Sequence, residues 1–260
     1  GDQVDSVNTL LAAKADVKLV SVNRNSPLHA AASSSSVTCL QALIQVRADV
    51  NQRCWGGKTA LSIAALNGSR DCVEFLLSAK ASINTADYAG RSPLYFAASR
   101  GHTSDVEFLC EAKADVEIHN AFGTSALSAA AFYGHADIVQ VLIDAKADFR
   151  IRERDGRTAL VIAAEQGHVN TANVLLQAGC PVDECDAQGN TPFLAAVRHD
   201  RSECAAALLA AGADITASNK RNLNALMLAA MNQYGRHGPT MDVLIDANAD
   251  VEAKTNVGTA

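Results

Sequence analysis

Residues 155–179 read DGRTALVIAAEQGHVNTANVLLQAG, and this stretch contains the signals for two short helices. Thr158 has the side chain of a helix N-cap, and Ala159 suits the first helical position. Gly167 is placed to end the first helix, and a later leucine pair gives the second helix an apolar face. The stretch therefore predicts a helix, a turn and an antiparallel second helix.

The same pattern recurs along the chain at a fixed interval of 33 residues. Each copy begins with a hydroxyl or amide residue, followed by Pro or Ala and then by Leu or Phe. These anchor residues are Ser26, Thr59, Ser92, Ser125, Thr158, Thr191 and Asn224. Because one such unit cannot bury its apolar side alone, neighbouring copies must stack against each other.

Two copies carry a family resemblance that extends over nearly the whole chain. Residues 122–148, FGTSALSAAAFYGHADIVQVLIDAKAD, and residues 155–179 resemble the ankyrin repeat, with its turn glycine, T-P-L-H-like start, alanines, G-H and G-A-D. The resemblance implies an all-α ankyrin-repeat solenoid of stacked helix-turn-helix units with short β-turn fingers. It also implies a protein-protein interaction module.

The repeat spacing predicts the organisation of the chain. We expect a single array over residues 1–260, with a partial repeat at 1–20 and seven full repeats at 21–253. Residues 254–260 read as the start of a further repeat. Because both ends fall within a repeat, we interpret the chain as a fragment of a longer array.

The composition argues against several classes of function. The 260 residues carry 22 Lys and Arg against 28 Asp and Glu, and a net charge of −6 is unlike that of a generally basic nucleic-acid-binding protein. No apolar run reaches the roughly 18 residues that a membrane helix needs. Seven cysteines without a C-x-x-C pair indicate a reducing compartment, so we predict a cytoplasmic protein. No nucleophile, base and orienting group occur together, so we predict neither an enzyme nor a cofactor or metal site.

Some residues that resemble functional motifs have a simpler explanation in the repeat. Gly57, Lys58 and Thr59 read like the end of a phosphate loop, but the glycine required five residues earlier is Gln52. Asn51 lies in a segment that resembles the ankyrin sites that asparaginyl hydroxylases modify. The same residue is common in the family because it stabilises a turn. We therefore expect neither nucleotide binding nor hydroxylation.

The histidines and cysteines are assigned by their place in the repeat. His102, His135 and His168 occupy the G-H position and are predicted to be structural. The T-P-L-H histidine survives only as His29, so we expect a weak hydroxyl-imidazole network. Four cysteines are predicted to be small buried residues: Cys39, Cys72, Cys110 and Cys204. Three fall in loops and are the candidates for reactive thiols: Cys54, Cys180 and Cys185.

The terminal repeats depart most from the pattern. Ser33 to Ser36 replace the expected glycine turn in the first repeat, and Asn222 replaces a turn glycine in the seventh. The seventh repeat also has a three-residue insertion within Asn232 to Pro239. We expect local stability to fall toward both ends, with the fastest hydrogen exchange before Leu43 and after Asn222.

A row of cations ends the second helices. Lys14, Arg47, Lys80, Lys113 and Lys146 occupy the position where the family usually has the glycine of G-A-D. A cation there stabilises the helix dipole by about 0.3 to 1 kcal/mol. We favour this helix-end role over a stripe that binds a polyanion, which stays the alternative.

The resemblance also implies which positions face a partner. In ankyrin arrays the finger tips and the exposed side of the first helix form a concave face. At those positions eight residues are basic and two are acidic, and the aromatic residues gather in repeats two to four. Because aromatic and arginine residues dominate interface hot spots, we predict a partner-binding site there. Its residues are Trp55, Lys58, Tyr88, Arg91, Arg100, Phe122, Phe132, Tyr133 and Arg157.

The predicted function is binding of a protein segment with an apolar anchor and acidic flanks by a monomeric chain that binds neither nucleic acid nor membrane. One alternative is a regulatory array of a larger enzyme or channel whose active part lies outside these residues. Another is binding of an anionic ligand or nucleic acid by the basic face, which would require a steep salt dependence.

Overall fold

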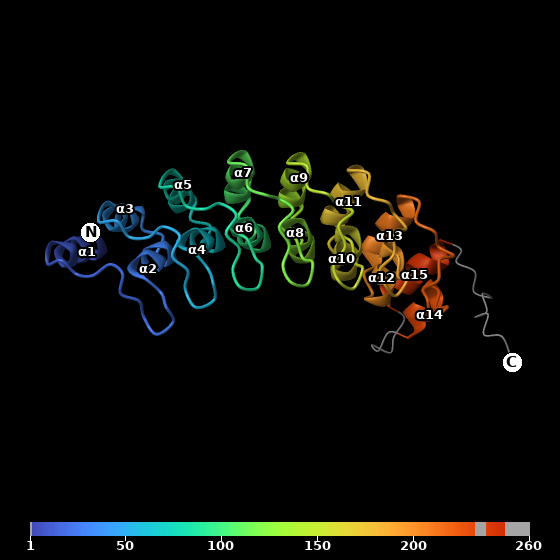
Figure 1. Ribbon diagram of the computed structural model, residues 1–260. Helices are drawn as coiled ribbons and strands as arrows, with labels where there is room; N and C mark the ends of the chain where they lie inside the picture. The colour runs from blue at the N-terminus through green and yellow to red at the C-terminus, as the bar shows by residue number, and fades with distance from the viewer. Residues whose placement is uncertain (1, 232–237, 248–260) are drawn as a thin grey trace. The chain divides into compact units, whose positions relative to one another are not determined.

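The computed structural model describes residues 2–231 and 238–247, and within them the chain is helical. These residues form fifteen α-helices and no β-sheet, apart from an isolated bridge between Ser218 and Asn224 (Figure 1). The prediction of an all-α fold is confirmed. The helices form two compact units, Gly1–Ala121 and Phe122–Ala260.

The first unit contains seven helices in its described residues. They are α1 (Asp2–Ala12), α2 (Pro27–Ser33), α3 (Val37–Gln45), α4 (Ala60–Asn67), α5 (Arg70–Ser78), α6 (Pro93–Arg100) and α7 (Thr103–Glu111). Helices α2, α4 and α6 lie side by side, and α3, α5 and α7 form a second layer (Figure 1). Each pair of consecutive helices therefore joins the two layers, as stacked repeats require.

The second unit repeats this arrangement. Its described helices are α8 (Ala126–Tyr133), α9 (Ala136–Asp144), α10 (Ala159–Gln166), α11 (Val169–Gln177), α12 (Pro192–Arg198), α13 (Ser202–Ala210), α14 (Ala225–Ala230) and α15 (Pro239–Asp246). Helices α8, α10, α12 and α14 make one layer, and α9, α11, α13 and α15 make the other.

Side-chain caps and glycines set the ends of the first helices. Thr59 Oγ1 accepts a hydrogen bond from the Ser62 amide at 3.3 Å, and Asn224 Oδ1 accepts one from the Met227 amide at 2.9 Å. Four first helices end at glycines with left-handed backbone, as the sequence predicted: Gly68, Gly101, Gly134 and Gly167.

Short β-turns form the fingers between the helix pairs. The Gly57 amide donates to the Cys54 carbonyl oxygen at 2.8 Å, and the Gly90 amide donates to the Asp87 carbonyl oxygen at 3.0 Å in the next finger. Successive fingers are also joined, since the Trp55 amide donates to the Asn23 carbonyl at 3.0 Å. This bonding holds each finger tip in a fixed place relative to the next finger of its unit.

The cations at the ends of the second helices have left-handed backbone. Lys14, Arg47, Lys80, Lys113 and Lys146 have φ between 59° and 71°, and Gly179 and Gly212 take the same place in later copies. A non-glycine residue there costs about 1 kcal/mol, and its favourable interaction with the helix dipole offsets part of that cost. All five cations are exposed.

The core corrects the assignment of three cysteines. Cys39, Cys72 and Cys204 are buried as predicted, but Cys110 is only half-buried because the second apolar position of α7 lies at the edge of its layer. Cys54 and Cys180 lie in loops and are nonetheless buried. Burial raises the pKa of Cys180 to about 12, so a reactive thiolate is disfavoured there.

One core position holds a carboxyl group that the sequence analysis did not single out. Asp105 on α7 is completely buried, and neither of its side-chain oxygens has a hydrogen-bond partner among the described residues. The equivalent side chains in other repeats are smaller or apolar: Cys39, Cys72, Ile138, Thr171 and Cys204. Burial raises the pKa of the Asp105 carboxyl above its ordinary range.

Two predicted features lie wholly or partly outside the described residues. They are the insertion within Asn232 to Pro239 and the start of a repeat at 254–260. In the part of the chain that the structure describes, no helix is long and apolar enough to cross a membrane.

Candidate functional site

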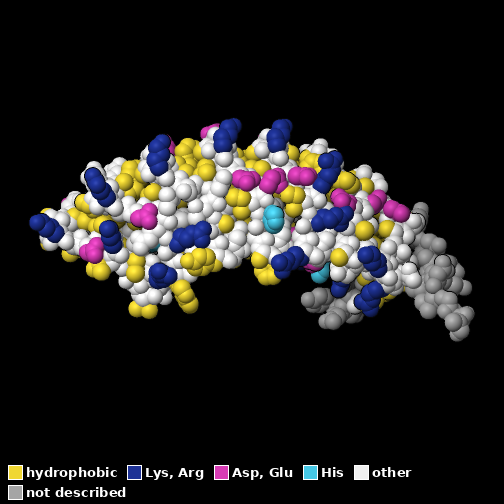
Figure 2. Space-filling view, viewed as in Figure 1, with side chains coloured by type: hydrophobic (Ala, Val, Ile, Leu, Met, Phe, Trp, Pro, Cys, Tyr) yellow, Lys and Arg dark blue, Asp and Glu magenta, His cyan; other side chains and the backbone are white. Residues whose placement is uncertain are grey.

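Two aromatic rings project from successive finger tips of the first unit. Trp55 is 73% exposed and Tyr88 is 66% exposed. Tyr88 contacts the preceding finger, because a Cβ atom added to Gly57 would lie 2.7 Å from its ring. Hydrophobic side chains stand out along this finger edge in Figure 2. The fingers, which backbone hydrogen bonds join to one another, therefore hold two large apolar rings in water.

Two residues outside the predicted site also lie on this edge. Val22 has the same repeat position as Trp55 and Tyr88, and its side chain is fully exposed at the first finger tip. The Arg53 guanidinium lies 5.6 Å from the centre of the Tyr88 ring and donates a hydrogen bond to the Ala86 carbonyl at 2.7 Å. The repeat position was the available signal for Val22, whereas the Arg53 contact depends on side-chain geometry.

The predicted cations of the first unit meet at a buried ring. Lys58 Nζ lies 5.5 Å from the centroid of Phe96, and Arg91 Cζ lies 5.0 Å from the same centroid. Arg91 also forms an ion pair with the buried carboxylate of Asp87 at 2.7 Å. Arg100, the remaining cation of the predicted set in this unit, is exposed in the last turn of α6.

The other predicted aromatic residues belong to the second unit. Phe122 is 68% exposed in a finger. Phe132 and Tyr133 are exposed at the end of α8, where their ring centroids are 5.0 Å apart in an edge-to-face arrangement. Tyr133 also stacks on His135. The five predicted aromatic residues are thus divided between the units, two in the first and three in the second.

Arg157 of the second unit is surrounded by carboxylates. It forms ion pairs with Glu153, Asp155 and Glu165 at 2.8, 2.8 and 2.9 Å. Burial lowers the pKa of Arg157, but the hydrogen bond to Glu165 and the nearby carboxylates raise it on balance. The two acidic residues that the sequence placed among the exposed positions, Asp155 and Glu165, are therefore both bound to this arginine.

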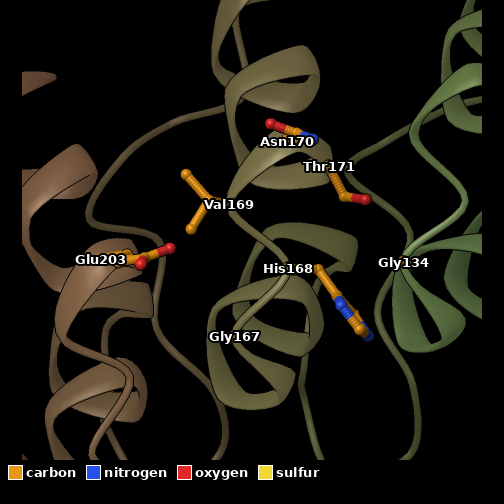
Figure 3. Close-up of a pocket in the computed structure, with 7 residues that line it drawn as sticks. All are labelled: Gly134, Gly167, His168, Val169, Asn170, Thr171 and Glu203. Atoms are coloured by element: carbon orange, nitrogen blue, oxygen red, sulfur yellow. The ribbon is translucent and has the colours of Figure 1, made fainter.

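A shallow polar pocket of the second unit surrounds the start of α11 (Figure 3). Its lining residues are Gly134, Gly167, His168, Val169, Asn170, Thr171 and Glu203. His168 points toward Gly134, and its Nε2 atom lies 3.0 Å from the Phe132 carbonyl oxygen. The Thr171 hydroxyl is buried without a hydrogen-bond partner in the described residues. His168, the side chain of this pocket best suited to acid–base chemistry, is therefore engaged with the backbone.

The comparisons with known proteins decide the family. A family profile described as "Ankyrin repeats (3 copies)" matches residues 1–87, 81–153, 130–219 and 178–255. The chain belongs to the ankyrin repeat family. Among solved structures, the human ASB11 ankyrin repeat domain is similar with a TM-score of 0.76 and 27% sequence identity, over 85% of this chain and 97% of that one. No curated protein matches the chain.

The ankyrin positions explain the residues that resembled functional motifs. His102 Nε2 lies 3.1 Å from the Leu66 carbonyl oxygen, which binds one repeat to the preceding one. Arg201 replaces this histidine in the sixth repeat and donates to the Glu165 carbonyl at 3.1 Å. Asn51 Oδ1 accepts a hydrogen bond from the Ser82 amide at 2.8 Å, a structural role between successive repeats.

The weakened hydroxyl-imidazole network is visible in the first unit. Ser26 Oγ lies 2.8 Å from His29 Nδ1, and His29 Nε2 lies 3.1 Å from the Lys58 carbonyl oxygen. In the next repeat Ser62 replaces the histidine and contacts Thr59 of its own repeat, at 3.2 Å. A serine is too short to reach the following finger, so this ankyrin array keeps the complete bridge at His29.

Ankyrin repeats are generally protein-protein interaction modules, and the fold is generally non-catalytic. Within residues 2–231 and 238–247 no group of three metal-ligating side chains lies together. The exposed aromatic residues of the fingers are large apolar side chains that the core of this ankyrin array does not bury.

Proposed function

We propose that the chain is a protein-interaction module that binds a segment of a partner protein. The binding surface is the finger face, which we define as the finger tips and the exposed side of the first helices. The observation that carries the proposal is the exposure of Trp55 and Tyr88 on neighbouring fingers of the first unit. Large aromatic rings held rigidly in water are typical anchors of interfaces.

The chemistry of the finger face indicates the kind of segment. The rings of Trp55 and Tyr88 favour an apolar side chain of the partner, and the nearby cations Arg53 and Lys58 favour acidic residues next to it. A cationic segment is disfavoured because Asp87, the carboxylate next to Tyr88, is buried and already paired with Arg91.

Affinity capture followed by titration of the captured partner tests the proposal. Trp55→Ala or Tyr88→Ala should weaken partner binding by about 2 kcal/mol or more, because each removes an exposed anchor ring. Both side chains are mostly in water, so the unfolding midpoint should change little.

Glu74→Ala on α5 is the matched control, since Glu74 is an exposed residue of the second-helix layer in the same unit. The control should bind the partner as the original chain does. A partner that binds the Trp55 and Tyr88 variants with unchanged affinity would refute the finger face as the binding surface.

A further inference from the structure

Two cations of the first unit share one aromatic ring. Lys58 comes from the second finger and Arg91 from the third, and both lie over the ring of Phe96 at 5.5 and 5.0 Å from its centroid. Phe96 is 3% exposed, so the ring has a fixed position in the core of α6. The packing of successive repeats therefore brings together two like charges from the fingers that also carry Trp55 and Tyr88.

These two charges are only half neutralised. The Arg91 Nε and Nη2 atoms both donate to Oδ2 of Asp87, at 2.9 and 2.7 Å. The Asp87 side chain is 1% exposed, and its other oxygen accepts the amides of Ala89 and Arg91. No carboxylate forms an ion pair with Lys58 in the part of the chain that the structure describes. One positive charge is left over at this place.

The same repeat position in the second unit has the opposite balance. Arg157 corresponds to Arg91, but three carboxylates bind it there. An anionic partner group would compete with those carboxylates at Arg157, whereas at Lys58 it would meet ammonium donors that no internal acid occupies among the described residues. Arg91 and Arg157, which the sequence assigns to one binding face, therefore differ in how readily their surroundings can bind an anionic group of a partner.

We propose that Lys58 and Arg91 receive a single carboxylate of the partner segment, from an Asp or Glu side chain next to the apolar anchor. The inference rests on the proposed function, because Trp55 and Tyr88 hold the anchor beside this carboxylate. The one positive charge left over on the Lys58 and Arg91 pair matches the single charge of a carboxylate. Ammonium and guanidinium donors to a carboxylate make hydrogen bonds that are stronger than those between neutral groups.

Selection from a random peptide library on the full 260-residue chain provides the probe. We expect the enriched peptides to carry Asp or Glu close to Trp, Phe or Leu. Replacing that acid with Asn or Gln should weaken binding roughly tenfold or more. Lys58→Gln should cause a similar loss, and the two changes together should cause no further loss, because both remove the same contact.

Lys80→Gln is the matched control, because Lys80 is an exposed cation of the same unit at the end of the second-helix layer. It should leave peptide affinity unchanged. Lys58 takes part in no ion pair in the described residues, and Gln keeps part of the aliphatic chain while removing one of the two like charges over Phe96, so Lys58→Gln should shift the unfolding midpoint little. Lys58→Glu should reverse the preference, and a peptide whose acid is changed to Lys should recover binding to it.

The results separate this inference from the proposed function. If Trp55→Ala weakens peptide binding while Lys58→Gln does not, or if the losses from Lys58→Gln and from the peptide acid add, the carboxylate site is wrong and the finger face stands. Peptides that bind the Trp55 and Tyr88 variants unchanged overturn both, as does a library that yields no enriched peptide.

Discussion

Asp105 should lower the stability of the first unit in a pH-dependent way. Its carboxyl group is completely buried on α7, and both oxygens lack hydrogen-bond partners in the described residues. A buried polar group without a partner costs about 1 to 3 kcal/mol, and more when it is charged. Asp105 lies in the first turn of α7, where the helix dipole returns about 0.3 to 1 kcal/mol to a carboxylate. The cost therefore exceeds the gain.

The direction of the pH dependence follows from the pKa shift. Burial raises the pKa of Asp105, and the positive charges of His102 and Arg70 oppose the shift without cancelling it. Below the unfolded pKa of about 3.9 the carboxyl is neutral in both states, and the folded state carries no ionic penalty. As the pH rises from the unfolded pKa through the folded pKa, the carboxyl ionises more readily in the unfolded state than in its buried site. The folded state therefore loses stability relative to the unfolded state over this range. The contribution of Asp105 to the free energy of unfolding should therefore decrease from acidic pH to neutral pH.

Two substitutions measure the effect by urea unfolding at several pH values. Two other repeats have a buried cysteine at the equivalent position, Cys72 and Cys204. Asp105→Cys should therefore fit there, and it should stabilise the chain by about 2 kcal/mol at neutral pH. Asp105→Asn keeps the shape and removes the titration. The stability difference between Asp105→Asn and the original chain should be larger at neutral pH than near pH 4. A difference that stays constant with pH would show that the carboxyl ionises as easily in the folded state as in the unfolded state, and the reasoning from burial would be refuted.

Two further predictions concern the repeat backbone. Gly134→Ala should destabilise the chain by about 1 kcal/mol more than Gly179→Ala. Both glycines have left-handed backbone, but of the two only Gly134 lies against a ring, since a Cβ atom added there would be 2.5 Å from His168. Urea unfolding of the two variants measures this, and equal losses would mean that the histidine moves freely. Hydrogen exchange followed by mass spectrometry should be slowest in α6 to α11 and fastest in α1 and α2 and in α14 and α15, because inner repeats have two neighbours. Uniform protection would indicate one cooperative unit.

The repeat period is sufficient to predict the fold. It assigns the caps at Thr59 and Asn224 and the left-handed glycines, because these depend on local chemistry that recurs in each copy. The same period holds a signal for the buried carboxyl of Asp105, since the position thirteen residues after each anchor is apolar or small in the neighbouring copies. A carboxylate in that series indicates a buried charge from the sequence alone.

The finger-face chemistry is harder to predict from the sequence. Arg91 and Arg157 share a repeat position, and both have an acid four residues earlier, Asp87 and Glu153. Only the folded side chains show that Glu165, from the helix that follows, also reaches Arg157. Repeat position predicts which way a side chain points, but its partners depend on rotamers and on residues one helix away.

The contrast between these two arginines bears on how such an array acquires specificity. The backbone bonds that join successive fingers are alike at Trp55 and at Ala187, so the scaffold does not distinguish the two units. In the second unit Arg157, the arginine at the repeat position of Arg91, is satisfied internally by three carboxylates. In the first unit, Trp55 and Tyr88 are exposed, and Lys58 has no internal acid among the described residues. Because a partner gains most where the free protein leaves groups unpaired and rings in water, the fingers at 55–58 and 88–91 are where binding energy should concentrate.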